Sequence, residues 1–212
     1  MIARGAASSP TLPGQTDPPG SLDSAPPSPL EVTIMAVTTS LMTIEEFCKL
    51  PEDDGPVYHE LRHGELVPVT RAKLKHQMIQ SRLRRLLEPL APPTALVEVE
   101  VAFRALPQYE FRLADVAYLG PERCAKVDPE DYIQGAPDLV IEVLSPSNTA
   151  SEIYDKEQLC LSNGAKEFWV VDPDRRQVKV STPDGRTITW QSGQEIPLLF
   201  SGTGIAADAI FA

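Results

Sequence analysis

Two acidic side chains lie inside apolar stretches of this 212-residue chain. Glu142 interrupts the run LVIEVL, and Asp115 lies within FRLADVAYL. An ionised carboxylate is costly to bury unless a cation or hydrogen bonds compensate it. Two such acids on neighbouring strands would repel one another, and a hard divalent ion such as Mg²⁺ would relieve that repulsion. The pattern predicts a metal site shared by Asp115 and Glu142.

The partner of Glu142 has to come from another strand. Asp138 lies four residues earlier, but in a strand that spacing places the two α-carbons ~13 Å apart. Lys156, in the helical segment SEIYDKEQL that follows the Glu142 strand, could orient a water and offset phosphate charge. The alternative is that Asp115, Glu142 and Lys156 are ordinary polar positions at strand ends or on a solvated helix face.

The segment HELRH, from His59 to His63, matches the H-E-x-x-H pattern of zinc metalloproteases. That chemistry needs a helix, on which positions i and i+4 share one face and reach one ion. Here polar and apolar residues alternate toward a His-Gly turn, which predicts a hairpin whose two histidines are ~13 Å apart. We therefore keep the zinc protease only as a third hypothesis, which an elemental analysis for zinc would test.

The elements that must position these residues follow from periodicity. Thr43 and Glu46 have the spacing of a capping box for a short helix. A hairpin is predicted over 57–69, and amphipathic helices over 72–90 and 148–162. Strands that alternate with two substantial helices indicate the α/β class with a mixed sheet. The other predicted strands are 96–103, 110–119, 137–144, 167–172 and 177–182.

Composition limits the classes of function. The net charge of −11 argues against broad, non-specific affinity for nucleic acid, so any basic surface must be local. Three widely spaced cysteines without a C-x-x-C pair favour reduced thiols and a cytoplasmic protein. No apolar run approaches the ~20 residues of a membrane span. Residues 1–38 are rich in Pro, Ser and Gly and are predicted to be a disordered tail ahead of a single domain over 39–212.

The same residues carry a family resemblance. YHELRHGELV, a helix with His76-Gln77, RLADVAYL, and the block from GAPDLVIEVLSPSN to NGAKEFWVVDP resemble the Uma-two family of restriction endonucleases. That family is a branch of the PD-(D/E)XK nuclease superfamily. The resemblance covers roughly residues 43–182. It implies a restriction-endonuclease-like core, in which a mixed sheet is flanked by helices and preceded by a short helix and a β-hairpin.

The resemblance also implies roles for single residues. Asp115 and Glu142 would hold Mg²⁺ or Mn²⁺, and Lys156 would be the catalytic lysine. The position that the E-x-K motif gives to lysine holds Leu144, so the lysine has moved to the next helix. Glu65 matches a further acid of the family, and the backbone carbonyl of Val143 is a natural additional metal ligand.

These residues predict a metal-dependent endonuclease that hydrolyses the phosphodiester bonds of nucleic acid, with DNA as the expected substrate. The stretch 71–85 holds six Lys or Arg residues and no acid, so it could contact phosphates or be a solvated helix face. By analogy, cutting of both strands suggests a homodimer. The alternative is a catalytically silent nuclease-fold module that binds nucleic acid or a protein partner.

Overall fold

The computed structural model describes residues 41–51, 55–106 and 108–212. The tail predicted for residues 1–38 lies outside these ranges. Within them, no helix combines the length and the apolar character needed to cross a membrane.

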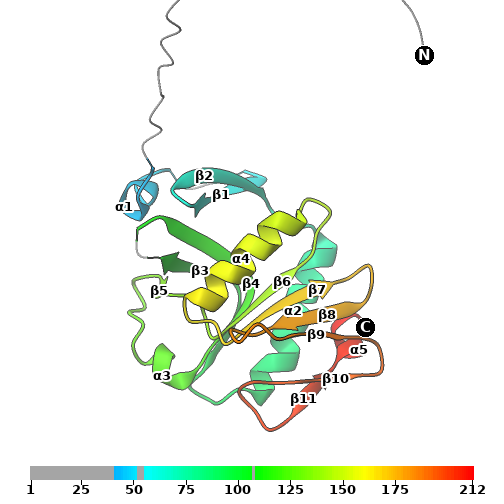
Figure 1. Ribbon diagram of the computed structural model, residues 1–212. Coiled ribbons are helices and arrows are strands. Elements are labelled where there is room, and N and C mark those ends of the chain that lie inside the picture. Colours follow the sequence, from blue (N-terminus) through cyan, green and yellow to red (C-terminus); the bar gives the residue numbers. More distant parts are fainter. Residues whose placement is uncertain (1–40, 52–54, 107) are drawn as a thin grey trace, which may run out of the picture. The chain divides into compact units, whose positions relative to one another are not determined.

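Nine strands of the described residues form one mixed sheet (Figure 1). They are β1 Val57–Arg62, β2 Glu65–Thr70, β3 Leu96–Leu106, β4 Glu110–Leu119, β5 Ile133–Gln134, β6 Leu139–Val143, β7 Glu167–Asp172, β8 Gln177–Ser181 and β9 Thr187–Trp190. The order along the main path is β2-β1-β4-β6-β7-β8-β9, and β3 pairs with both β4 and β5. The β6–β7 pair is parallel and β4–β6 is antiparallel, so the predicted mixed sheet is confirmed.

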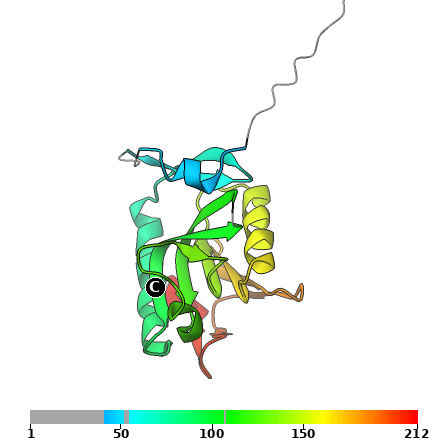
Figure 2. The same cartoon turned by 90° about the vertical axis from the view of Figure 1, so that its left-hand side faces the viewer.

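Two long helices cover opposite faces of this sheet, as Figure 2 shows. One face packs on α2, where Leu83 and Leu87 join Val116 and Ile141 in one core. The other packs on α4, where Ile153 and Leu159 join a second core. The helices are α1 Ile44–Phe47, α2 Leu74–Leu87, α3 Pro121–Cys124, α4 Ala150–Ser162 and α5 Ala207–Ile210, and the 3₁₀ turn η1 Glu88–Leu90 extends α2.

Local chemistry explains where these helices begin. Thr43 and Glu46 form the predicted capping box of α1, and Thr149 and Glu152 form another at the start of α4. In each box the threonine oxygen accepts from the backbone of the glutamate, whose carboxylate accepts from the threonine N–H. Helix α4 therefore begins directly after the loop that follows β6.

The hairpin β1–β2 confirms the interpretation of HELRH as extended chain. Its two-residue turn places His63 at φ 50° and Gly64 at φ 78°, which are the positive values that a tight hairpin turn requires. The register pairs Arg62 with Glu65 across this turn. A helix that could bring two histidines to one zinc ion is therefore not formed by this segment.

The C-terminal region adds elements that the sequence did not predict. A separate two-stranded sheet joins β10 Glu195–Pro197 to β11 Gly204–Ala206. Its residues Ile196 and Ile205, with Ile210 of α5, belong to the core on the α2 side of the main sheet. This segment closes the core against α2.

Candidate active site

The candidate site lies where β4 leaves one neighbouring strand and joins another. β4 pairs with β6 through Val116 to Tyr118, and with β1 at Phe111. Between these points β1 and β6 diverge, and we call the gap the fork. Buried backbone polar groups need partners. Here side chains supply them: Glu60 Oε1 accepts from the Leu113 N–H at 3.0 Å, and the Leu113 carbonyl accepts from Lys156 Nζ at 2.7 Å.

Asp115 and Glu142 meet in this fork from adjacent strands. The backbone N–H of Val143 donates to Asp115 Oδ2 at 2.7 Å. The backbone N–H of Asp115 points at Glu142 Oε1 at 3.4 Å, longer than an ordinary N–H···O bond. Each carboxylate therefore accepts from a backbone N–H of the other strand, in the place that a backbone carbonyl takes in a regular β-ladder.

Lys156 compensates the buried Glu142. Its Nζ donates to Glu142 Oε2 at 2.7 Å, and both residues are less than a tenth exposed. Burial raises the pKa of Glu142 to about 7; the charge of Lys156 opposes this rise, and repulsion by Asp115 and Glu60 adds to it. Burial opposes the charge on Lys156, but attraction to Glu142, Glu60 and Asp115 outweighs it and raises the pKa of this lysine. Lys156 is therefore a permanent cation within an excess of acids.

Helix α2 contributes two side chains that contact Asp115. Gln80 Nε2 donates to Asp115 Oδ1 at 3.0 Å. The Nε2 atom of His76 lies 3.0 Å from the same oxygen, within ion-pair distance but outside hydrogen-bond geometry. Burial opposes protonation of His76, but its contact with Asp115 and the charges of Asp115, Glu142 and Glu100 outweigh it and raise its pKa. Asp115 is thus held from α2 as well as from β6.

Of the two acids in the hairpin, Glu60 rather than Glu65 lies in the fork. Glu60 is 2% exposed, and its Oε1 lies 4.0 Å from Lys156 Nζ. Glu65 is exposed at the start of β2. Sequence reasoning missed Glu60 because alternation in HELRH indicates only that it lies on a strand, not which face that strand buries.

Comparisons with known proteins identify the family and the fold of this chain. Residues 44–205 match the model of the Uma2 family, whose description is "Putative restriction endonuclease". The chain belongs to the Uma2 family. Among solved structures it is similar to "a putative nuclease belonging to DUF820" from Anabaena variabilis, with a TM-score of 0.69 and 24% identity. The match covers 80% of this chain and 97% of that one and confirms the predicted restriction-endonuclease-like fold. No curated protein matches the chain.

In this Uma2 member a second polar cluster, the α4 clasp, lies beside the fork. The buried Arg112 bonds Glu110 at 2.8 Å on its own strand and Asp155 of α4 at 3.0 Å. The hairpin residues reach the same helix: Arg62 lies 2.9 Å from Glu152, and His63 lies 2.9 Å from Asp155. The clasp consists of Arg62, His63, Glu110, Arg112, Glu152 and Asp155, and it ties the helix that carries Lys156 to β1 and β4.

The donor set of the fork fits a hard divalent cation. Asp115 and Glu142 lie on adjacent strands, and among the described residues the hydrogen bond to Glu142 Oε1 is the long 3.4 Å contact from the Asp115 N–H. Over the described part of the chain, no three His, Cys, Asp or Glu side chains are arranged to enclose a metal ion. Mg²⁺ suits such an open site, since it is usually bound by one or two carboxylates and completed by waters and phosphate oxygens.

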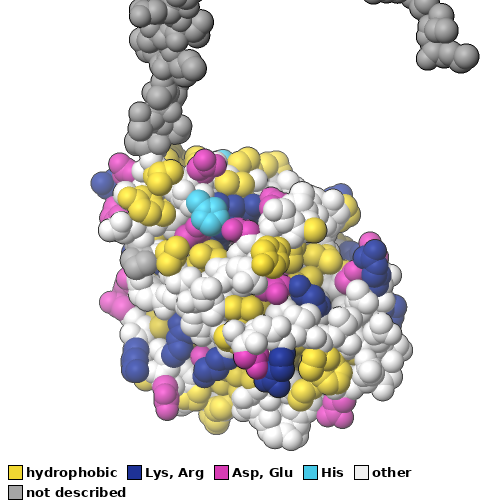
Figure 3. Space-filling model, in the orientation of Figure 1, with side chains coloured by type: hydrophobic (Ala, Val, Ile, Leu, Met, Phe, Trp, Pro, Cys, Tyr) yellow, Lys and Arg dark blue, Asp and Glu magenta, His cyan; other side chains and the backbone are white. Residues whose placement is uncertain are grey.

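The basic stretch 71–85 is largely engaged with the protein itself. Arg82 donates to the carbonyl of Ile210, Arg84 pairs with Glu98 at 2.9 Å, and Lys75 lies 3.2 Å from Asp174. Figure 3 shows the opposite face of the molecule, over which α4 lies, and there basic and acidic side chains are interspersed. Phosphate contacts from this stretch would thus have to compete with existing internal partners.

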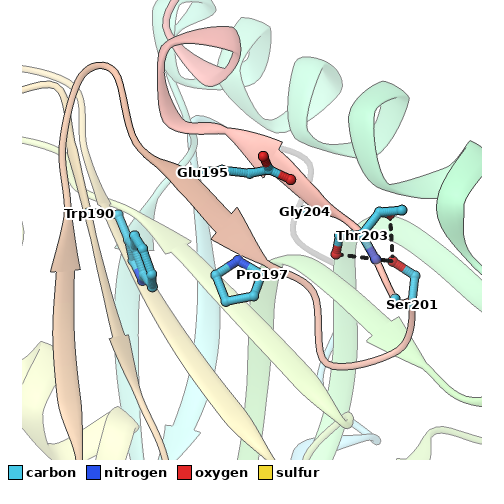
Figure 4. Close-up of a pocket in the computed structure, with 7 residues that line it drawn as sticks. Trp190, Glu195, Pro197, Ser201, Thr203 and Gly204 are labelled. Carbon is cyan, nitrogen blue, oxygen red and sulfur yellow. Dashed lines mark hydrogen bonds between the residues drawn. The ribbon is translucent and has the colours of Figure 1, made fainter.

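A separate pocket of about 400 Å³ lies near the C-terminus, between Trp190 and the β10–β11 segment (Figure 4). Its lining includes Glu195, Ser201 and Thr203. None of the fork residues lines it, so this pocket and the candidate site are different places in the fold.

Proposed function

We propose that this Uma2 member is a metal-dependent endonuclease that hydrolyses phosphodiester bonds of nucleic acid, with DNA as its substrate. The supporting observation is the convergence of Asp115, Glu142 and Lys156 in the fork. Lys156 of α4 donates to Glu142 at 2.7 Å, and each acid lies within 3.4 Å of a backbone N–H on the strand of the other. A buried carboxylate whose pKa is raised to about 7 beside a second acid is the perturbed titration that marks many functional sites.

Each side chain has a distinct role in this proposal. Asp115 and Glu142, together with the Val143 carbonyl, would hold Mg²⁺ or Mn²⁺. When bound, such an ion would lower the pKa of a water ligand and withdraw charge from the phosphate. Because three carboxylates keep Lys156 protonated, it acts as a hydrogen-bond donor and a fixed positive charge rather than as a base.

Glu60 and Gln80 act as supports. Glu60 fixes the Leu113 amide and faces the Lys156 ammonium, so it holds β4 and the lysine at the fork. Gln80 donates to one oxygen of Asp115 and so orients its carboxylate from α2. Glu65, at the exposed start of β2, could act only at the edge of the site, on a metal-bound water or on the substrate.

Cleavage of supercoiled plasmid DNA with Mg²⁺ or Mn²⁺ tests the proposal. We expect nicking by the wild-type protein and its loss in Glu142→Ala and Lys156→Ala. Glu167→Gln is the matched control, because this carboxylate lies on the neighbouring strand β7 but bonds Trp169, away from the fork. Equal nicking by wild type, Glu142→Ala and Lys156→Ala would exclude this site.

One observation favours a second candidate, a catalytically silent binding module. Lys156 and the Val143 amide already bond both carboxylates, so each acid has a partner within the protein itself. Calorimetric titration with Mn²⁺ separates the two candidates. The nuclease requires binding that disappears in Asp115→Asn, whereas a silent module would show no such binding while retaining affinity for DNA or a protein partner.

A further inference from the structure

Strands β3 and β4 both change face in mid-strand, opposite one another. Residues of equal parity in a regular strand share one face of the sheet. Yet Val99 packs against the core on the α2 side, whereas Val101 packs against the core on the α4 side. On β4, Ala114 belongs to the α4-side core and Val116 to the α2-side core. The alternation of side chains between the two faces of the sheet therefore shifts by one residue, at Glu100 in β3 and at Asp115 in β4. We call this shift the slip.

The backbone of Glu100 accounts for this slip. Its φ is 52°, in the left-handed region that non-glycine residues rarely adopt. Of the three non-glycine residues with positive φ in the described ranges, His63 and Arg176 lie between strands and Glu100 alone lies within one. The register pairs Val99 with Val116 and Val101 with Ala114, so Glu100 and Asp115 lie opposite one another at a position where β3 and β4 form no ladder pair.

The slip decides where Asp115 points. If the alternation of Ala117 and Leu119 continued, residue 115 would face α4. Instead Asp115 contacts Gln80 of α2, and its carboxylate takes the Val143 N–H at the edge of β6. The strained residue and the acid thus lie opposite one another at the same interruption of the β3–β4 ladder.

We propose that Glu100 is a positioning residue, and that its left-handed backbone, rather than its carboxylate, turns Asp115 into the fork. Strained backbone persists only where surrounding structure enforces it, and it concentrates at functional sites. The Glu100 side chain is exposed, so packing of that side chain does not explain its conformation. The role in catalysis rests on the proposed nuclease function, whereas the orientation of Asp115 does not.

Three variants separate backbone from side chain. Glu100→Gly accepts φ 52° without strain, Glu100→Val disfavours it most because of β-branching, and Glu100→Gln removes only the charge. The main readout is amide exchange by NMR at Val143, whose N–H donates to Asp115. The next amide, Leu144, donates to the Val171 carbonyl and serves as the internal control.

We expect Glu100→Gly to keep Val143 protected and to raise Tm by about 2–4 °C. In Glu100→Val, Val143 should exchange at least about tenfold faster, as expected for loss of a hydrogen bond to a charged group, while Leu144 is unchanged. Mn²⁺ affinity measured by calorimetry should fall in Glu100→Val and stay at the wild-type level in Glu100→Gly and Glu100→Gln. Plasmid nicking, where present, should fall by about 100-fold in Glu100→Val alone.

Several results would overturn the proposal. One is unchanged Val143 exchange in folded Glu100→Val; another is accelerated exchange in Glu100→Gln or Glu100→Gly. Should Glu100→Val not fold, a Tm of Glu100→Gly below that of wild type would still contradict it. Absence of nicking by the wild type would remove the nuclease but leave the exchange experiment decisive for the orientation of Asp115.

Discussion

The fork and the α4 clasp lie on the same strands and the same helix, but they are charged differently. In the fork, Glu60, Asp115 and Glu142 surround one lysine, and the pKa of Glu142 is raised to about 7. In the clasp, burial opposes ionisation of Asp155, but bonds from His63 and Arg112 outweigh it and lower its pKa. Each acid of the clasp thus has an arginine nitrogen within 3.0 Å, whereas the fork holds three acids and one lysine, and its Glu60 draws on Arg62 of the clasp at 3.0 Å.

This difference separates stability from chemistry. A matched cluster holds elements together, since every acid has a cation within reach and gains nothing from a further ion. A cluster with surplus negative charge stores repulsion that a divalent cation would relieve. The clasp therefore fixes the position of α4, and the fork uses the lysine that α4 carries.

Removal of the central cation of the clasp should have the largest effect. Arg112→Met leaves the fully buried Glu110 without its main partner and should lower the free energy of unfolding by about 3–5 kcal/mol. Urea denaturation measures this, with Arg186→Met, whose partner Asp184 is also exposed, as the control that should change little. A loss below about 1 kcal/mol would contradict the assignment of the clasp as the stabilising cluster.

Removal of Lys156, the cation of the fork, should instead lower the rate of DNA cleavage. Lys156→Met takes away the ammonium bonded to Glu142, and plasmid nicking should slow by about 10²–10³-fold. The control is Lys179→Met. Lys179 lies on β8 and pairs with Glu157 of α4 outside the fork, so this variant should nick DNA at nearly the wild-type rate. Equal slowing in both variants would mean that α4 is merely destabilised.

The surplus acid should also make stability depend on pH. The pKa of Glu142 is raised from 4.5 to about 7, so the native state binds this proton more tightly than the unfolded state does. This contribution is fully present below pH 4.5 and is lost as pH rises through 7. Without divalent ions it amounts to on the order of 3–4 kcal/mol, at ~1.4 kcal/mol per pKa unit.

Urea denaturation at pH 5 and pH 8 measures this loss. Glu142→Gln should lack it, and Mg²⁺ should restore stability to the wild-type protein mainly at the higher pH. An identical dependence in Glu142→Gln would assign the effect to other groups.

The smallest effect is expected at the exposed end of the clasp. His63 bonds Glu110 and Asp155, but its side chain is 61% exposed, so solvent screens both contacts. His63→Asn keeps a residue that tolerates the positive φ of the turn, and it should lower the free energy of unfolding by only about 0.2–1 kcal/mol. Thermal unfolding measures the change, and a loss as large as that of Arg112→Met would contradict this ranking.

Much of the fold was predictable because its signals are local. The hairpin at His63-Gly64, the capping box at Thr43, and the main strands follow from turn chemistry and periodicity over a few residues. The C-terminal elements β10, β11 and α5 were missed because they are three or four residues long and carry little periodicity. Asp115 and Glu142 stood out because an acid in an apolar run is conspicuous, and the structure places them on adjacent strands.

The sequence by itself determined the main strands and the helices α1, α2 and α4, and which acids lie among apolar residues. Only the tertiary structure decided that Glu60 joins the fork, that Arg112 and Asp155 form the clasp, and that Glu100 reverses the alternation of β3. These facts depend on which strands are neighbours and on which face each residue takes. A single positive φ shifts that face by one residue, and no local pattern in the sequence records it.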